Sequence, residues 1–269
     1  MTAYLNYVFN QTSSQTPTIP NKELFISQPP GPAILVWTNT NVFPNLTGVS
    51  VVSELNSVGM NSNSVRSTNL ISNLSQTITN TGNQNRSTLP FLDIKYDFPN
   101  DLLIINGTNY TVTTGGDYIA TQFNLSTTGS RTKSVNSSTS VTDPFHIWSR
   151  DFFSGSMVKK LDIDMASYDS SNNTFTGLFE IKRSANSNFN NWQPYTDDKP
   201  NYEMVMALAD ELNIPFHTIH HNEVQERVID ESKLVNVYSY TPQAGQSWND
   251  FRSFNNRQQV SAKQTLALL

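Results

Sequence analysis

The sequence predicts an α/β protein of the α+β type, in which a mixed β-sheet flanked by helices follows a β-rich N-terminal region. Three observations point to this class. Short apolar runs separated by turns rich in Pro, Asn and Gly fill the first half of the chain. Two alternating segments joined by a short polar turn come next, followed by an amphipathic segment and two further apolar runs. We expect a β-rich region of unknown role at 1–140 and a second part, 141–269, that carries the chemistry.

The first part is typical of strands and hairpins. AILVW and GVSVVSEL are short apolar runs between Pro-containing turns, and NG and GG pairs separate FLDIKYDF, DLLII and DYIATQFNL. A serine-rich stretch at 126–140 is expected to be a linker or a mobile loop. Because no compact cluster of chemically active side chains occurs in this part, we expect it to be a scaffold.

The second part begins with a predicted antiparallel hairpin. Polar and apolar residues alternate through KKLDIDMASYD (159–169), SSNN is a turn, and alternation resumes in TFTGLFEIKRS (174–184). Alternation places Glu180 and Lys182 on the strand face opposite Ile181. The carboxylates of Asp162 and Asp164 on the first strand can share that face with the Glu–Lys pair.

A helix and two more strands complete the expected order. Asp197 or Asp198 can cap a helix at about 199–213, where Pro200 suits the first turn and apolar residues recur at helical spacing. The apolar runs at 214–221 and 233–242 read as strands. The predicted order is strand, strand, helix, strand, strand.

This order, with Asp164 on one strand and Glu180-Ile181-Lys182 on the next, resembles the PD-(D/E)xK nuclease superfamily. That superfamily includes many restriction endonucleases, Holliday junction resolvases and repair nucleases. The resemblance covers residues 143–242 and implies a restriction-endonuclease-like sheet and a metal-dependent endonuclease. The DIDMA pattern favours Asp164 over Asp162 as the superfamily's aspartate, although the proline that often precedes this aspartate is lacking.

The resemblance also implies roles for the site residues. Asp164, Glu180 and Lys182 would be catalytic, and Asp164, Glu180 and the backbone carbonyl of Ile181 would hold Mg²⁺, for which Mn²⁺ is expected to substitute. Carboxylates are hard oxygen ligands of the kind Mg²⁺ prefers, and a bound divalent cation lowers the pKa of its water. The Lys182 ammonium would position that water or stabilise charge in the transition state.

These residues also have simpler structural explanations. Glu and Lys two residues apart on one strand face commonly form a simple ion pair, which contributes little to stability when exposed. Asp162 is either an acid supporting the metal ligands or a solvated strand charge. His146 precedes the motif, where some RNA-cleaving relatives place a metal-binding histidine on a helix.

Basic residues for nucleic-acid contact are Lys160, Arg183 and Arg252, each of which could instead belong to an ordinary surface. Arg252 lies in SWNDFRSFNNRQQVSAKQ, the most basic stretch of the chain, where phenylalanines alternate with the charges. A terminal helix packed on the domain is the plainer explanation of this tail.

Histidine clusters near one predicted strand, and a zinc site there is conceivable. Three of the four histidines are His217, His220 and His221, close to Glu223. Strand alternation places His220 on the face opposite the other two. One zinc ion could therefore not easily gather all three.

Composition limits the remaining options. The net charge is −5, and the acidic excess lies entirely in 141–269, which opposes nucleic-acid binding unless the acids hold cations. The absence of Cys excludes disulfides and thiolate sites. No signal-peptide pattern begins the chain and no apolar run reaches the roughly 20 residues of a membrane span, so we expect an intracellular, soluble protein without membrane contact.

The resulting hypothesis is an Mg²⁺-dependent endonuclease that hydrolyses phosphodiester bonds, with DNA as the expected substrate and RNA as the alternative. Homodimerisation is an open expectation, since many relatives that cut both strands dimerise. The competing class is a structural or binding protein, such as a β-rich virion component, because Ser-, Thr- and Asn-rich β segments with few charges suit shells.

Overall fold

The computed structural model of the chain forms two compact units. Unit 1 comprises Met1–Phe25 and Ile163–Leu269, and unit 2 comprises Ile26–Asp162. The structure describes residues 3–4, 7, 22–27, 32–39, 41–55, 89–125, 143–153, 158–169, 171–172, 174–184, 189–225 and 228–269. The serine-rich stretch at 126–140 lies outside these residues. The division of the chain into domains at 1–140 and 141–269 remains a prediction.

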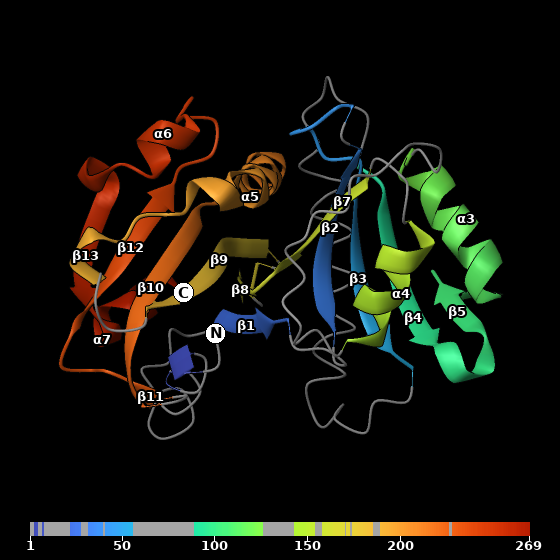
Figure 1. Ribbon diagram of the computed structural model, residues 1–269, viewed down its shortest axis with the longest axis horizontal. Helices are drawn as coiled ribbons and strands as arrows, with labels where there is room; N and C mark the ends of the chain where they lie inside the picture. Colours follow the sequence, from blue (N-terminus) through green and yellow to red (C-terminus); the bar gives the residue numbers. More distant parts are fainter. Residues whose placement is uncertain are drawn as a thin grey trace. The chain divides into compact units, whose positions relative to one another are not determined.

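Unit 2 is built on a six-stranded mixed sheet with the order β6-β5-β4-β3-β2-β7 (Figure 1). Its strands are β2 (Ala33–Asn39), β3 (Gly48–Glu54), β4 (Phe91–Asp97), β5 (Leu102–Ile105), β6 (Thr108–Tyr110) and β7 (Val158–Ile163). Its helices are η1 (Phe98–Asn100), α3 (Val112–Gln122) and α4 (Pro144–Phe152). β3 and β4 are parallel, whereas β2 and β3, β4 and β5, and β5 and β6 pair antiparallel.

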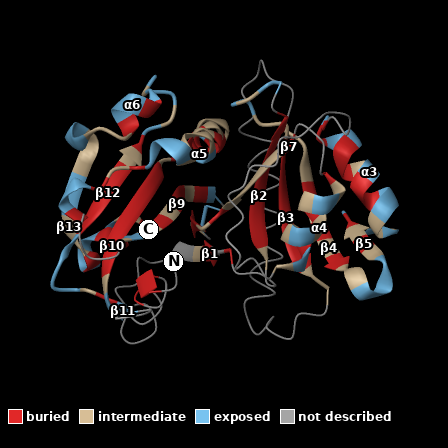
Figure 2. Ribbon diagram, viewed as in Figure 1, coloured by how far each residue is buried: buried red, intermediate tan, exposed pale blue. Residues whose placement is uncertain are grey.

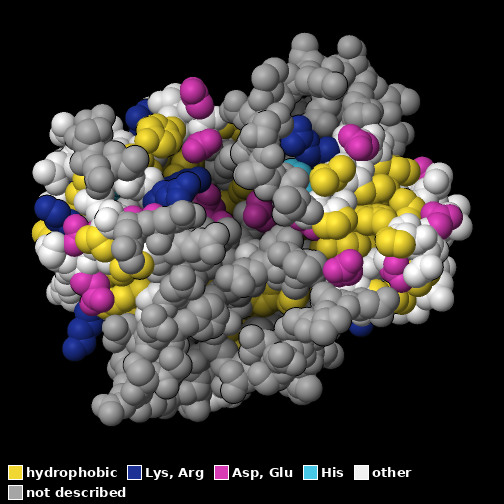
Figure 3. Space-filling view, turned by 60° about the horizontal axis from the view of Figure 1, so that its bottom comes forward, with side chains coloured by type: hydrophobic (Ala, Val, Ile, Leu, Met, Phe, Trp, Pro, Cys, Tyr) yellow, Lys and Arg dark blue, Asp and Glu magenta, His cyan; other side chains and the backbone are white. Residues whose placement is uncertain are grey.

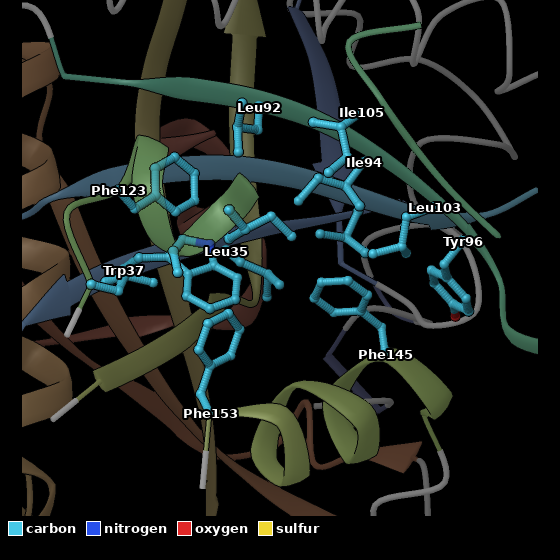
Figure 4. Packing of buried hydrophobic residues seen from close by; sticks show 14 of the residues in the cluster. Leu35, Trp37, Leu92, Ile94, Tyr96, Leu103, Ile105, Phe123, Phe145 and Phe153 are labelled. Carbon is cyan, nitrogen blue, oxygen red and sulfur yellow. The ribbon is translucent and has the colours of Figure 1, made fainter. Parts of the chain in front are cut away.

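Aromatic side chains fill the core of unit 2 (Figure 4). Trp37 of β2 is fully buried between Phe123 and Phe153, with ring centroids 5.7 Å away in each case. Its indole N–H donates to Ser50 Oγ at 2.9 Å, which satisfies the one polar group that this side chain brings into the core. Gly48 leaves room for Phe123, since a Cβ at this position would lie 2.1 Å from the ring. This core holds the sheet and helices of unit 2 together.

The sheet of unit 1 positions the predicted site. Its order is β1-β8-β9-β10-β12-β13, and β11 pairs with β10. The strands are β1 (Lys22–Ile26), β8 (Met165–Asp169), β9 (Thr174–Ser184), β10 (Phe216–Gln225), β11 (Val228–Ile229), β12 (Leu234–Tyr240) and β13 (Arg257–Ser261). β9 and β10 are parallel, while β8 with β9, β10 with β12 and β12 with β13 are antiparallel. Buried residues predominate in its central strands (Figure 2).

Helix α5 (Lys199–Leu212) makes the crossover between the parallel strands β9 and β10. The smaller helices of unit 1 are η2 (Phe189–Asn191), η3 (Thr196–Asp198), α6 (Trp248–Phe251), η4 (Phe254–Asn256), α7 (Ala262–Thr265) and η5 (Leu266–Leu268). Tyr202 of α5 packs against Phe216 of β10 and Phe251 of α6, with ring centroids 6.3 and 5.7 Å apart. The expected helix at 199–213 is confirmed, and it ends at Asn213 in the left-handed conformation. Asp198 occupies the N-cap position but makes no side-chain capping bond.

The α+β class is confirmed, and so is the pairing of 165–169 with the E-x-K strand. Two strand predictions are wrong. Segment 117–125, expected as a strand, lies mostly in α3, because Thr111 caps the helix by accepting from the Thr114 N–H and buried residues recur at helical spacing. The strand expected at 159–169 divides at Asp164, so that β7 joins the sheet of unit 2 and β8 joins that of unit 1.

The C-terminal tail also differs from the expected terminal helix. Its basic stretch forms α6, η4, β13 and the start of α7, and β13 lies at one end of the sheet of unit 1. Within the described residues, no helix combines the length and the apolar character needed to cross a membrane.

Candidate active site

Asp164 lies directly before β8, beside the part of β9 that carries Glu180. Met165 pairs with Phe179, and continuing this antiparallel register by one residue places Asp164 opposite Glu180. Asp164 Oδ2 accepts a hydrogen bond of 2.7 Å from the backbone N–H of Ile181. The chain bends at Asp164, so its carboxylate turns onto the backbone of the neighbouring strand. This contact fixes the Asp164 carboxylate against the Glu180-Ile181-Lys182 segment.

Lys182 is the centre of a charged group on the same face of β9. Its ammonium Nζ lies 2.7 Å from Glu180 Oε1 and 3.9 Å from Asp198 Oδ2. The side chains of Lys182 and Glu180 are 26% and 13% exposed, so the pair is half-buried and accessible from solvent at one side. Burial lowers the pKa of Lys182, but Glu180, Tyr202 and Asp164 together outweigh it and raise that pKa above its ordinary value. The ammonium therefore stays charged at neutral pH.

Tyr202 is a member of this group that the sequence did not single out. Its ring lies under Lys182, with Nζ 5.8 Å from the ring centroid. Burial raises the pKa of the Tyr202 phenol, and the Lys182 ammonium partly offsets the rise. Tyr202 also belongs to the apolar face of the helix, because its ring packs on Phe216. Its contact with Lys182 depends on the packing of α5 against β9, which the sequence alone does not show.

The row of the sheet next to Lys182 contains a buried histidine. His220 of β10 pairs in register with Lys182, and Asn236 of β12 pairs with His220. The imidazole of His220 stacks on Trp192 at 4.0 Å between centroids and on Phe189 at 5.0 Å. Its Nδ1 lies 3.2 Å from Asn236 Nδ2. Burial lowers the pKa of His220 to about 3, so the ring is neutral at physiological pH.

The other two clustered histidines lie on the opposite face of β10. His217 Nδ1 is 2.9 Å from Ser239 Oγ, and His221 Nε2 is 3.5 Å from Glu223 Oε1. Burial lowers the pKa of each to about 4. The part of the chain that the structure describes contains no group of three or more His, Asp or Glu side chains arranged to hold a metal ion. The conceived zinc site has no support in this geometry.

Three of the predicted residues belong to unit 2. Lys160 Nζ donates to Ser149 Oγ at 2.5 Å and lies 5.5 Å from the centroid of the Phe145 ring. Burial lowers its pKa to about 8. Burial and the nearby Lys160 also lower the pKa of His146, while Asp162 acts in the opposite direction. These three residues form one electrostatic group within unit 2, whereas Asp164 belongs to unit 1.

Arg183 and Arg252 remain in unit 1 with the acids. The Arg183 side chain is 67% exposed and lies 3.9 Å from Glu223 Oε2, on the strand face opposite Lys182. Arg252 Nη1 donates to Thr196 Oγ1 at 2.8 Å. Acidic, basic and apolar side chains are interspersed on the face of the molecule in Figure 3.

Comparison of the chain with family models, curated proteins and solved structures finds no match. The functional argument therefore depends on the residues and their geometry.

Proposed function

We propose that the chain is a metal-dependent endonuclease that hydrolyses phosphodiester bonds in DNA, with Asp164, Glu180 and Lys182 as its catalytic residues. The observation that carries this proposal is the convergence of these three side chains. Asp164 is hydrogen-bonded to the backbone of the E-x-K strand, and Glu180 is 2.7 Å from Lys182. The sequence resemblance rests on the same order of an aspartate, a Glu-x-Lys strand, a helix and a further strand.

The donor set suits a hard divalent cation. Two carboxylates from facing positions of an antiparallel pair provide oxygen ligands, and the backbone carbonyl of Ile181 is the third predicted ligand. Mg²⁺ usually keeps several waters and takes only one or two carboxylates from a protein, so this set is sufficient. When bound, the cation would supply an acidified water and neutralise phosphate charge.

The residues of the chain would contribute charge and position. Asp164 is held in one orientation by the Ile181 N–H, so the carboxylate does not have to be ordered when substrate arrives. Lys182 is held between Glu180 and the Tyr202 ring and remains protonated, so it can stabilise negative charge on a phosphate oxygen. Its side chain is 26% exposed, so part of it is accessible to a ligand.

The test is incubation of the purified protein with supercoiled DNA and Mg²⁺ or Mn²⁺, with an EDTA-treated sample in parallel. We expect nicked and linear products with the metals and intact DNA with EDTA. A labelled RNA in the same series decides between the two substrates, and size-exclusion chromatography decides whether the active species is a homodimer. Intact DNA and RNA with either metal would contradict the proposal and favour a structural role for the ion pair.

A further inference from the structure

Two arginines, Arg252 and Arg257, lie in the C-terminal part of unit 1. Arg252 follows α6 and Arg257 begins β13. Arg252 donates to the hydroxyl of Thr196, and Arg257 donates to the backbone carbonyl of Asn190. Among the described residues neither guanidinium pairs with a carboxylate, in a chain whose net charge is −5.

Both arginines influence one buried tyrosine, Tyr238. Both act electrostatically on the hydroxyl of Tyr238, lowering its pKa, although burial is the larger effect and raises that pKa to about 12. Tyr238 pairs in register with Arg257 and donates its hydroxyl to the Trp192 carbonyl at 2.7 Å.

Neutral contacts hold both arginines in place. Arg257 Cζ lies 4.7 Å from the centroid of the Phe254 ring, and Arg252 Cζ lies 5.8 Å from that of Trp248. Stacking on an aromatic ring orients a planar guanidinium without neutralising its charge. The fork of donors is thereby prepared for a phosphate, which it binds in two-pronged geometry.

Exposed aromatic rings flank the arginines. Tyr195 is 58% exposed and Phe254 is 46% exposed, both unusually high for large apolar rings. Tyr195 begins the loop that carries Thr196, the partner of Arg252, and Asp198, which lies 3.9 Å from Lys182. Nucleic-acid bases stack on exposed aromatic rings whatever the nucleotide sequence. The combination of cations and rings fits a nucleic-acid strand better than a simple anion.

The sheet register sets the distance from this surface to the candidate active site. Glu180 pairs with Thr218, Thr218 with Tyr238, and Tyr238 with Arg257, so Arg257 lies three strands from Glu180 in one row. At about 4.8 Å per strand the separation is about 14 Å, or roughly four steps of a duplex with a rise of 3.4 Å.

We propose that Arg252 and Arg257, with Tyr195 and Phe254, form a binding surface for the nucleic-acid strand a few nucleotides from the bond that is cut. The guanidiniums take one or two backbone phosphates, and the rings take bases. This inference rests on the proposed nuclease function, which identifies the bound strand as the substrate. Asp197 on the same loop repels phosphate, so the arginine pair has to outweigh it.

The test measures binding without cleavage. Fluorescence anisotropy of a labelled single-stranded DNA oligonucleotide is followed in EDTA over a series of salt concentrations, with the full chain as parent. Arg252→Ala/Arg257→Ala is expected to weaken binding by about tenfold or more. It should also reduce the slope of log affinity against log salt by about 1.4, as the loss of two phosphate contacts predicts. Tyr195→Ala is expected to weaken binding about fivefold with an unchanged salt slope.

Controls separate this surface from general charge and from misfolding. Lys233→Ala/Lys263→Ala removes two exposed cations outside the surface and should bind within about twofold of the parent. Arg252→Lys/Arg257→Lys retains both positive charges. It should therefore recover most of the salt slope that the alanine variant loses, if that loss comes from missing phosphate contacts and not from misfolding. Two results would overturn the inference. In one, Arg252→Ala/Arg257→Ala binds like the parent. In the other, it binds no more weakly than Lys233→Ala/Lys263→Ala.

The two proposals can fail separately. Loss of oligonucleotide binding in the arginine variant, combined with an inactive parent in Mg²⁺, would support the surface and contradict the nuclease. Parent-like binding by the arginine variant, combined with an active parent, would contradict the surface and leave the nuclease intact.

Discussion

Replacement of Lys182 by methionine is expected to reduce the rate of DNA cleavage by about 100-fold or more. Methionine retains an unbranched apolar side chain over the Tyr202 ring and removes the ammonium that lies 2.7 Å from Glu180. The lost charge would otherwise oppose the negative charge that develops on the phosphate. Single-turnover cleavage with saturating Mg²⁺ measures this loss in the chemical step.

Folding has to be controlled in the same experiment, because the Glu180–Lys182 pair is half-buried. Removal of one partner leaves a carboxylate short of a hydrogen bond, so we expect a stability loss of about 1–3 kcal/mol, more than a fully exposed pair would give. Lys199→Met is the matched control, since Lys199 pairs with Glu203 at 3.5 Å on the surface of α5. This control should cut at the parent rate.

A structural ion pair predicts a different result for the same two variants. If Glu180 and Lys182 only stabilise the sheet, Lys182→Met lowers the free energy of unfolding while cleavage continues at the parent rate wherever the protein is folded. Such an outcome would remove Lys182 from the catalytic residues. It would also make the E-x-K segment a stabilising contact and nothing more.

Acidification is expected to destabilise unit 1 strongly. His217, His220 and His221 are buried, and burial lowers their pKa values to about 4, 3 and 4. The unfolded chain, with histidine pKa values near 6.5, binds protons that the folded chain does not bind as the pH falls below that value. Stability is therefore fully present above about pH 6.5 and falls toward the folded pKa values.

The size of this effect follows from the pKa differences. Between about pH 7 and pH 5 each histidine costs about 2 kcal/mol, and the three together cost up to about 6 kcal/mol. This is a large part of the 5–15 kcal/mol stability of an ordinary domain. Urea unfolding at the two pH values, followed by tryptophan fluorescence, measures the loss.

A single variant assigns part of the acid effect to one histidine. His217→Gln retains a side chain that can bond Ser239, and it removes the group that titrates. The variant should lose about 2 kcal/mol less than the parent over the same pH interval. Equal losses in the two proteins, or a parent whose stability does not change between pH 7 and 5, would show that the histidines are not buried as described.

The sequence could predict the elements whose own residues determine them. Helix α5 combines an apolar stripe with Pro200 in its first turn, and β9 alternates from Phe179 to Lys182, so both were expected near their observed positions. Local pattern failed for α3, where Ile119 is buried on a helix although DYIATQFNL resembles a strand. Core packing decided between the two periods, and a short segment does not contain that information.

The site could be predicted only in part, for the same reason. Glu180 and Lys182 are neighbours along one strand, so their contact follows from alternation alone. The hydrogen bond from the Ile181 N–H to Asp164 requires the strand to break between β7 and β8. The two strands belong to different sheets, so the break depends on tertiary structure. The positions of Tyr202 and Arg257 depend on the crossover of α5 and on the register of β12 with β13. No spacing in the sequence encodes these tertiary neighbours.

Calorimetric titration with Mn²⁺ tests the central claim most directly, namely that Asp164 and Glu180 together hold a divalent cation. The parent is expected to bind Mn²⁺, and Asp164→Asn/Glu180→Gln is expected to lose that binding while its unfolding midpoint stays close to the parent's, because both amides retain the size of the acids. Glu211→Gln/Glu231→Gln removes the same charge elsewhere in unit 1 and should bind like the parent. Binding of Mn²⁺ by the Asp164→Asn/Glu180→Gln protein with parent affinity would contradict the account.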